Sequence, residues 1–421
     1  MELDALVIGC GNIGSVITGL LVKGKHNVGI LEASQMIPNL KIKEGGCEKI
    51  FDILNCSNAY FYSPASIEKI RLKKRAPIIV TAKTYSAGSV AEDLSRINAV
   101  NGLDSNQIIL FQNGVNPEQR IKDSLLKNNL GKIVDNVFGA VLMMMAHPIS
   151  NGIVEYKINK INLGCWDGNK KINEILSTVV HYFPFSFVDV SGTDSYKKSR
   201  LEKAALNSAN SLCALFDATA GDLIENEITR IMLELKIKEC AGISEACGYK
   251  LNDIMEKWDS ASKMVYEHYP SMVYDFRRAI KYKEELKTEI DELDGAFVKL
   301  HRFGAAWPKY NDSCTEMIKK FMELFNTLHE RDRLTGGNTA VETAKEFTDV
   351  NRLLVEMPRF EVNLPDKVEK DISRKFRYWE IREIKEGLGN GGDKCIEHIA
   401  NDALFYMWGN LIRLEIEHKI Y

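Results

Sequence analysis

A single lysine interrupts an otherwise apolar stretch of the chain, KAALNSANSLCALF at residues 203–216. At helical spacing, Lys203, Asn207, Asn210 and Ser211 share one stripe, while apolar residues cover most of the remaining circumference. Such a helix is expected to be buried, and buried helices seldom carry an amine and two amides without a role. This stripe is therefore the first candidate for chemistry.

Proton transfer is the chemistry that Lys203 suggests. A hydride that reaches a ketone carbon leaves an alkoxide, which an ammonium can protonate, and partial burial lowers the pKa of a lysine toward working pH. Asn207, one turn further on, would align the carbonyl or hold a neighbouring carboxylate. The alternative is that Lys203 extends to the surface while the amides cap or bridge helices, and periodicity alone does not separate the two.

A glycine-rich loop lies near the N-terminus. Gly9, Gly11 and Gly14, with Asn12 and Ile13 among them, follow the apolar run ALVI and precede the apolar run SVITGLLVKG. A strand, this loop and a helix, in that order, are typical of a dinucleotide-binding turn, in which backbone N–H groups at the helix start face a pyrophosphate.

The second predicted strand, HNVGILEASQ, carries an acidic residue at its end, Glu32. A carboxylate at this position of a dinucleotide-binding domain hydrogen-bonds the adenosine ribose and repels a 2′-phosphate. The next basic residue is Lys41, so no neighbour replaces the arginine of a 2′-phosphate site. The sequence favours NAD(H), with NADP(H) as the alternative; a plain solvent-facing glutamate would also give this pattern.

Length and composition bound the remaining classes of protein. The 421 residues exceed the roughly 250–300 that one core supports, so several domains are expected. The 55 basic and 58 acidic residues are mixed along the chain, which argues against a nucleic-acid partner. The 9 cysteines and 8 histidines show no metal-ligand spacing, so we expect reduced thiols and no metal. No apolar run is long enough to span a membrane and no signal peptide is recognised, so we expect a cytoplasmic protein.

The pattern of elements predicts an α/β fold with a Rossmann-type dinucleotide-binding domain over residues 1–190, an all-helical substrate and catalytic domain over 191–328, and a helical extension over 329–421. Helix breaks are expected at Gly221, Gly248, Pro270 and 304–308. Strands are predicted at Ala5–Ile8, Val28–Leu31, 77–81, 108–111, 134–144, 152–156, 160–163 and 185–190.

Aromatic side chains of the extension predict an apolar face. This face would either dock on the helical domain of the same chain or form a homodimer interface. The residues concerned are Phe376, Tyr378, Trp379, Phe405, Tyr406 and Trp408.

Seven segments, in order, carry a resemblance to a known family: GCGNIG, TAKTYS, ILFQNGVNPEQ, NGIVEY, SRLEKAALNSANSLCAL, PSMVYDF and KTEIDELDGAFVKLHRFG. Over about residues 1–328 the sequence resembles the ketopantoate reductases, also called 2-dehydropantoate 2-reductases. The resemblance implies a Rossmann domain, a 6-phosphogluconate-dehydrogenase-like helical domain with a cleft between the two, and hydride transfer from a nicotinamide cofactor to a branched 2-oxo acid.

The same resemblance implies roles for individual residues. Lys203 matches the catalytic lysine and Asn207 the first substrate-binding asparagine. Asn113 matches the residue placed between nicotinamide and substrate, and Lys83 a lysine near the cofactor.

Two more assignments come with departures from the family. Ser271 matches a substrate-binding serine, and Glu289 the catalytic-site glutamate that closes over substrate and cofactor ribose. A second substrate-binding asparagine falls on Ser211, with Asn210 beside it, so the contacts to a substrate hydroxyl are expected to differ. Asp294 replaces a common asparagine, the segment between Ser271 and Glu289 is long, and the acid ending the second strand disagrees with the family's usual NADPH.

The sequence therefore predicts an NAD(P)H-dependent reductase of a small 2-oxo acid, ketopantoate or a close relative, with Lys203 as general acid. A dehydrogenase of a larger, opine-like or otherwise modified 2-hydroxy acid is the alternative enzyme, because the extension would enlarge the pocket. A non-catalytic NAD-binding sensor or scaffold is the third interpretation. The presence of Lys203, Asn207 and Glu289 together argues against it, because a pure sensor has no use for a proton donor.

Overall fold

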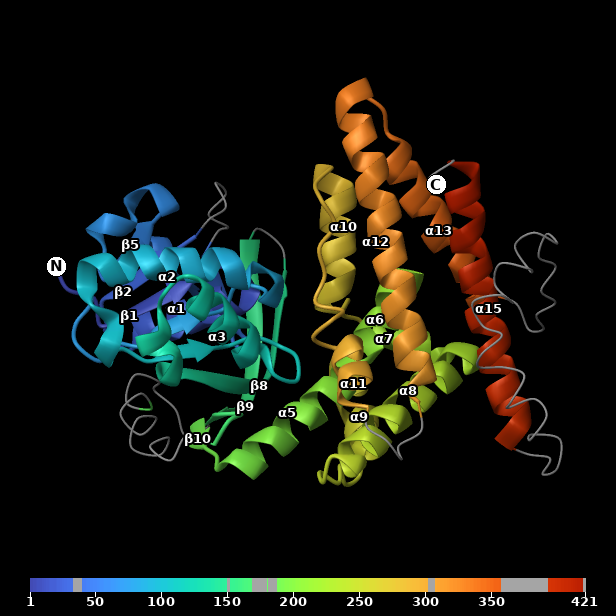
Figure 1. Ribbon diagram of the computed structural model, residues 1–421, viewed down its shortest axis with the longest axis horizontal. Coiled ribbons are helices and arrows are strands. Elements are labelled where there is room, and N and C mark those ends of the chain that lie inside the picture. The colour runs from blue at the N-terminus through green and yellow to red at the C-terminus, as the bar shows by residue number, and fades with distance from the viewer. Residues whose placement is uncertain are drawn as a thin grey trace. The chain divides into compact units, whose positions relative to one another are not determined.

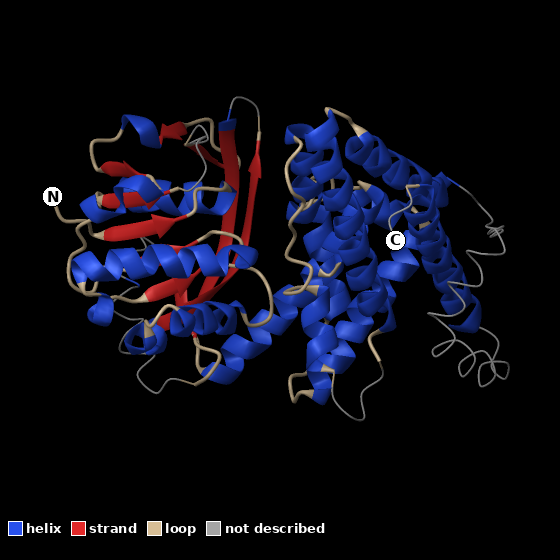
Figure 2. Cartoon of the chain, turned by 45° about the horizontal axis from the view of Figure 1, so that its top comes forward, coloured by secondary structure: helices blue, strands red, loops and turns tan. Residues whose placement is uncertain are grey.

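The computed structural model describes residues 1–32, 40–149, 152–168, 180, 188–301, 307–356 and 393–418. The chain divides into two compact units, Met1–Ala204 and Ala205–Tyr421 (Figure 1). The first unit is α/β and the second is helical (Figure 2), which confirms the predicted fold class. The three-part division at residues 190 and 328 stays a prediction.

A ten-stranded mixed sheet forms the first unit. Its parallel part runs β5-β2-β1-β6-β7-β8, which is the 3-2-1-4-5-6 strand order of dinucleotide-binding folds. β9 pairs antiparallel with β8 and parallel with β3 and β10, and β4 pairs antiparallel with β3. The strands are β1 (Ala5–Ile8), β2 (Val28–Leu31), β3 (Lys41–Glu44), β4 (Ile50–Asp52), β5 (Ala59–Tyr62), β6 (Ile78–Val80), β7 (Ile108–Leu110), β8 (Val137–Pro148), β9 (Ile153–Gly164) and β10 (Val188–Val190).

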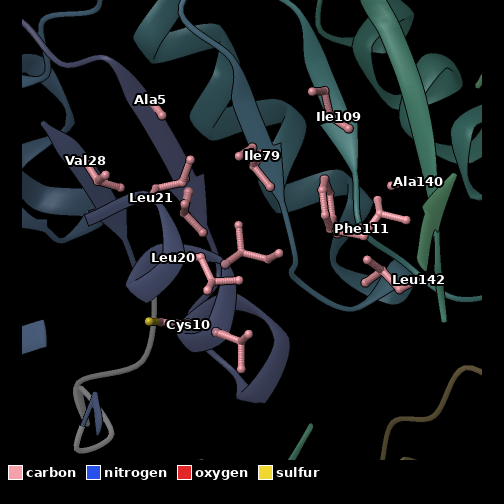
Figure 3. Close-up of a cluster of buried hydrophobic side chains, with 14 of the residues drawn as sticks. Ala5, Cys10, Leu20, Leu21, Val28, Ile79, Ile109, Phe111, Ala140 and Leu142 are labelled. Atoms are coloured by element: carbon pink, nitrogen blue, oxygen red, sulfur yellow. The ribbon is translucent and has the colours of Figure 1, made fainter. Parts of the chain in front are cut away.

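Helices cover both faces of this sheet. Ala5 and Val7 of β1 bury in a cluster with apolar residues of α1, part of which Figure 3 shows. Leu6 and Ile8 bury on the opposite face, in a cluster with residues of α2 and α3. Because both faces are buried, the central strands are continuous apolar runs, which is why they were predictable. Among the described residues, the α-helices of this unit are α1 (Asn12–Lys23), α2 (Ala87–Asn101), α3 (Pro117–Lys127) and most of α5 (Thr193–Asn207), whose last three residues belong to the second unit.

The prediction of strands was incomplete at the sheet edges. β3, β4 and β5 were missed: β4 and β5 are the two edge strands, β3 lies beside β4, and their short runs of partly exposed side chains, such as KIKE, break the apolar pattern. The two strands predicted at 152–156 and 160–163 are one strand, β9, which pairs with β8 from Val154 to Gly164 with one register shift at Met143/Met144.

The helical unit is built from α6 (Ala209–Phe216), α7 (Ala220–Glu225), α8 (Glu227–Ala246), α9 (Ile254–Met264), α10 (Ser271–Tyr282), α11 (Asp294–Leu300), α12 (Lys309–Thr335), α13 (Thr339–Glu356) and α15 (Asp393–Glu417). Gly248 and Pro270 lie between helices, as predicted. Gly221 does not: it lies inside α7, which begins at a capping box formed by Thr219 and Asp222.

The helix predicted across residues 203–216 is interrupted. α5 ends at Asn207 and α6 begins at Ala209, with the buried Ser208 between them. The Ser208 hydroxyl donates to the carbonyl of Ala205 at 2.8 Å. Such back-bonding of serine to an upstream carbonyl weakens or bends a helix, and here it accompanies the break. The proposed single stripe therefore belongs to two helices.

The described part of the extension packs inside the helical unit. α12 runs unbroken through residue 328, where the extension was expected to begin. Phe347 of α13 stacks on Phe321 of α12 at 4.6 Å between ring centroids, and Phe321 stacks on Phe276 of α10 at 5.5 Å. Trp408 of α15 is buried, and the Tyr406 hydroxyl donates to a carbonyl of α13. These contacts support docking on the same chain.

Three of the aromatic residues predicted to form that face, Phe376, Tyr378 and Trp379, lie outside the described residues, as does the side chain of Phe405. A homodimer stays a prediction. In the described ranges, no helix is long and apolar enough to cross a membrane.

Candidate active site

The glycine-rich loop has the geometry of a dinucleotide-binding turn. Gly9 has a φ of +93°, which favours glycine, and a side chain there would lie 2.6 Å from the backbone nitrogen of Ala82. A side chain on Gly14 would collide with the carbonyl of Gly9, so this glycine allows α1 to pack against the strand ends. At Gly11, by contrast, no atom lies within 4 Å of an added Cβ, which leaves room for a ligand.

The start of α1 suits an anion. Gly11 is its N-cap, and Asn12 and Ile13, both half-buried, form the first turn. Among the described residues no side chain caps this end, and no acidic residue lies in the first turn. The N–H groups and the positive end of the helix dipole are thus directed at the open side of the loop, where a pyrophosphate would bind.

Glu32 follows β2 directly and contacts the loop. Its Oε2 accepts a hydrogen bond of 2.5 Å from the backbone N–H of Cys10. The carboxylate is therefore held beside the turn, where the ribose contact was predicted. Lys41 opens β3, and its ammonium lies 3.8 Å from the carboxylate of Asp52. Cys10 itself is buried, and burial raises the pKa of its thiol to about 12, so it is no nucleophile.

Lys83 and Asn113 lie at the same edge of the sheet as the loop. They follow β6 and β7, which are parallel to β1 and successive neighbours in the sheet. Hydrogen bonds connect the three loops. The Thr81 hydroxyl donates to the carbonyl of Gly9 at 2.6 Å, and the side-chain amide of Gln112 donates to the carbonyl of Ala82 at 2.5 Å. Each of these bonds lies next to a predicted cofactor-binding residue.

Lys203 lies in the last turn of α5 and is half-buried. Burial lowers the pKa of its ammonium. Within the described residues of its unit, the ammonium makes no hydrogen bond or ion pair. A desolvated lysine without a carboxylate partner gives up a proton more readily than a surface lysine, as a general acid requires.

A buried cluster next to Lys203 was missed by the sequence reasoning. Arg200, one turn before Lys203, donates to the Tyr196 hydroxyl at 2.7 Å, to the carbonyl of Gln112 at 2.6 Å and to Glu118 at 3.3 Å. Tyr196 in turn donates to the Glu118 carboxylate. All three side chains are almost completely buried. The only sequence signal was two polar residues, Tyr196 and Arg200, at helical spacing.

The helical unit holds the remaining predicted residues. Asn207 ends α5, Asn210 lies in the first turn of α6, and both are half-buried. Ser271 is the first residue of α10, which packs against α6. Glu289 is buried in the segment before α11. Within this unit, Asn210 and Ser271 thus come from neighbouring helices.

Ser211 has a different environment from the one predicted. It is 1% exposed, its hydroxyl lies 2.5 Å from Asp294 Oδ2, and the Lys236 ammonium donates to it at 2.6 Å. Lys236 also donates to Asp294 at 2.5 Å, and both side chains are buried. The hydroxyl is committed to this ion pair, so the geometry does not favour the predicted substrate contact. Sequence reasoning noted Asp294 as unusual but missed Lys236, which lies in the long helix α8.

Comparison with known proteins gives consistent results. The family model "Ketopantoate reductase PanE/ApbA" matches residues 5–168, and "Ketopantoate reductase PanE/ApbA C terminal" matches 195–321. A 2-dehydropantoate 2-reductase of Aquifex aeolicus (strain VF5) is 26% identical over 341 residues, which are 77% of this chain and 99% of that protein.

Solved structures show the same fold. A PanE/ApbA family ketopantoate reductase from Ralstonia eutropha JMP134 superposes with a TM-score of 0.58 at 18% identity, covering 76% of this chain and 98% of that one. A D-mandelate dehydrogenase, solved with NADH and anilino(oxo)acetate, gives a TM-score of 0.56 at 20% identity, covering 74% of this chain and 96% of that one.

Proposed function

The chain belongs to the ketopantoate reductase family, whose members are oxidoreductases acting on CH–OH groups, and we propose that it reduces a small 2-oxo acid to the 2-hydroxy acid with Lys203 as general acid. The observation that carries the proposal is the state of Lys203: half-buried, with a lowered pKa, and without a partner in the described part of its unit. A surface lysine with a structural role would have its ordinary pKa.

The first unit supplies the cofactor site. The residues fit a nicotinamide dinucleotide, because Gly11 leaves an open cradle at the start of α1 and Glu32 is held beside it. When bound, the reduced nicotinamide supplies a hydride to the carbonyl carbon. The loop would hold the pyrophosphate through backbone N–H groups, and the Glu32 carboxylate would accept hydrogen bonds from the ribose hydroxyls, which would favour NADH over NADPH.

Lys203 moves the proton. As the carbonyl carbon gains the hydride, its oxygen becomes an alkoxide, and the Lys203 ammonium protonates it and later regains a proton from solvent. A 2-oxo carboxylate offers only hydrogen-bond acceptors. Asn113, Asn207, Asn210 and Ser271 would donate to these oxygens, and Glu289 would close over substrate and ribose.

The substrate side chain is where this chain departs from its family. If a second family asparagine contacts a substrate hydroxyl, Ser211 is a poor replacement, because Asp294 and Lys236 occupy its hydroxyl. We therefore propose a 2-oxo acid related to ketopantoate whose recognition does not need that contact. Larger oxo acids, including opine precursors, are the alternative that a substrate screen would detect.

Replacement of Lys203 tests the proposal. Lys203→Ala should lower turnover of the best 2-oxo acid about 10²-fold or more, because a general acid is lost, while the dissociation constant of NADH stays within about threefold. Lys198→Ala, on the same helix and also half-buried, is the matched control and should retain turnover. Nearly unchanged turnover in Lys203→Ala would refute the role of the lysine.

The wild-type protein provides the second test. If it binds NADH but oxidises it with no 2-oxo acid tested, the sensor hypothesis replaces the reductase. If it binds neither NADH nor NADPH, both proposals are wrong. A mass measurement of nucleotide carried through purification is the first step.

A further inference from the structure

We infer that the buried cluster of Arg200, Tyr196 and Glu118 positions Lys203 relative to the loop that carries Asn113, so that Arg200 is a positioning residue for the reduction. The inference rests on the proposed function of Lys203. It adds three residues to which neither the family resemblance nor the comparisons give a role.

Arg200 connects two segments that are far apart in sequence. Its Nη1 donates at 2.6 Å to the carbonyl of Gln112, which belongs to the peptide group that continues into Asn113. Lys203 lies three residues after Arg200, on the neighbouring turn of the same helix. A displacement of the guanidinium would therefore move the lysine and the asparagine relative to each other.

The connection extends to the rest of the cofactor edge. The Gln112 side chain donates to the carbonyl of Ala82, next to Lys83, and the backbone N–H of Ala82 donates to the carbonyl of Ile8, which precedes the glycine-rich loop. One chain of hydrogen bonds thus passes from α5 through the loops after β7 and β6 to the end of β1. Each step holds backbone beside a predicted site residue.

The sheet contains a slot for this cluster. Gly139 of β8 and Gly164 of β9 are cross-strand partners. A side chain on Gly139 would collide with Glu118 and the Tyr196 hydroxyl, and one on Gly164 would collide with the Tyr196 ring. Two paired glycines in long strands are costly for the strands themselves, so the slot is best explained by what it accommodates.

Stability alone is a poor explanation of the cluster. A buried ion pair is often no more stabilising than apolar residues of the same volume. In the described residues, Glu118 Oε2 has no hydrogen-bond partner, so the carboxylate is not fully compensated. An arginine is suited to this site by its geometry. The planar guanidinium donates to a hydroxyl, a carbonyl and a carboxylate at the same time, whereas a lysine ammonium is a compact point charge.

Lys203 lies close to the boundary between the two units. The first unit ends at Ala204, one residue after Lys203. The cluster lies in the part of α5 that belongs to the first unit, so it ties Lys203 to the cofactor-binding unit. Lys203 would then be held in the same unit as the loop that carries Asn113.

The test replaces the Arg200 guanidinium with a lysine ammonium, which keeps the positive charge. Arg200→Lys should lower kcat at least about tenfold, since displacements near 1 Å at a reacting centre cost up to about 10²-fold, while the NADH dissociation constant changes less than about threefold. Arg96→Lys is the matched control, because Arg96 forms an exposed ion pair with Glu68 in the same unit. If Arg200→Lys does not fold, Tyr196→Phe takes its place. This variant keeps the ring beside Gly139 and Gly164 and removes only the hydroxyl, and kcat should fall at least about threefold.

A second readout does not depend on turnover. Amide hydrogen exchange of residues 111–116 should be faster in Arg200→Lys than in the wild type and in Arg96→Lys, because the Gln112 carbonyl loses its partner. A wild-type protein without any oxo-acid reductase activity would refute the proposed function. The amide hydrogen exchange of residues 111–116 would then decide by itself whether the cluster holds the loop that carries Asn113. Unchanged kcat or unchanged exchange in the folded variant would overturn the positioning role.

Discussion

Removal of one aromatic ring from the extension should destabilise the whole helical unit. Phe347 of α13 is 0% exposed and stacks on Phe321, which in turn stacks on Phe276 of the Ser271 helix. A buried Phe→Ala substitution costs about 3–5 kcal/mol, and the close stacking at 4.6 Å places Phe347→Ala in the upper part of this range. Since domains are typically stable by about 5–15 kcal/mol, this is a large fraction of the total.

Urea unfolding followed by tryptophan fluorescence is the suitable assay. Four of the five tryptophans, Trp258, Trp307, Trp379 and Trp408, lie in the sequence of the helical unit, so its transition dominates the signal. Leu334→Ala, at a position 77% exposed near the end of α12, is the matched control and should stay within about 0.5 kcal/mol of the wild type. A loss below about 1 kcal/mol in Phe347→Ala, or a separate early transition of the extension, would show that the extension is an appendage and would refute the reasoning.

Three further predictions concern charges. Because burial lowers the pKa of Lys203 from its ordinary 10.5, kcat for reduction should fall as the pH rises through a midpoint below 10.5, since only the ammonium donates; a midpoint at or above that value would contradict the assignment. Glu32→Gln should shift the NADH-to-NADPH ratio of kcat/KM about tenfold or more toward NADPH, equivalent to about 1.4 kcal/mol of lost repulsion, and an unchanged ratio would argue against the ribose contact. Asp294→Ala should lower the free energy of unfolding in urea by about 3–5 kcal/mol, because it leaves the Lys236 ammonium buried and unpaired. The double variant Asp294→Leu with Lys236→Met should recover most of this loss. Equal losses in the two variants would contradict the ion-pair account.

The cofactor-binding half of the fold was predictable because its signals are local. The run ALVI, the three glycines and the helix after them form one continuous segment, and their geometry follows from short-range sterics. Gly9 and Gly14 are required by contacts within that turn and with the next strand end. The edge strand β4 escaped prediction because its side chains are partly exposed and do not follow an apolar pattern.

The contacts that were missed are those between distant segments. Glu118 and Arg200 are 82 residues apart, and Lys236 and Asp294 are 58 apart, so no spacing rule links either pair. In sequence, Lys236 is one charge on a helix with an apolar face, and Glu118 is an acid in a first helical turn. Only the fold shows that both are buried and paired. The break at Ser208 was also unpredictable, since serine is tolerated in most helices.

The cations Arg200, Lys236 and Lys203 differ in the direction of their pKa shifts, and a general acid that must be recharged needs a lowered pKa. Arg200 lies against Glu118 and Lys236 against Asp294, and these partners raise the pKa of each cation despite the opposing effect of burial. Lys203 has burial but, in the described part of its unit, no carboxylate, so its pKa is lowered. A paired lysine would hold its proton too tightly to protonate an alkoxide and then be recharged at working pH. Carboxylates thus pair with the two cations that have structural roles, whereas Lys203, the one that is proposed to react, has no such pair in the described residues of its unit.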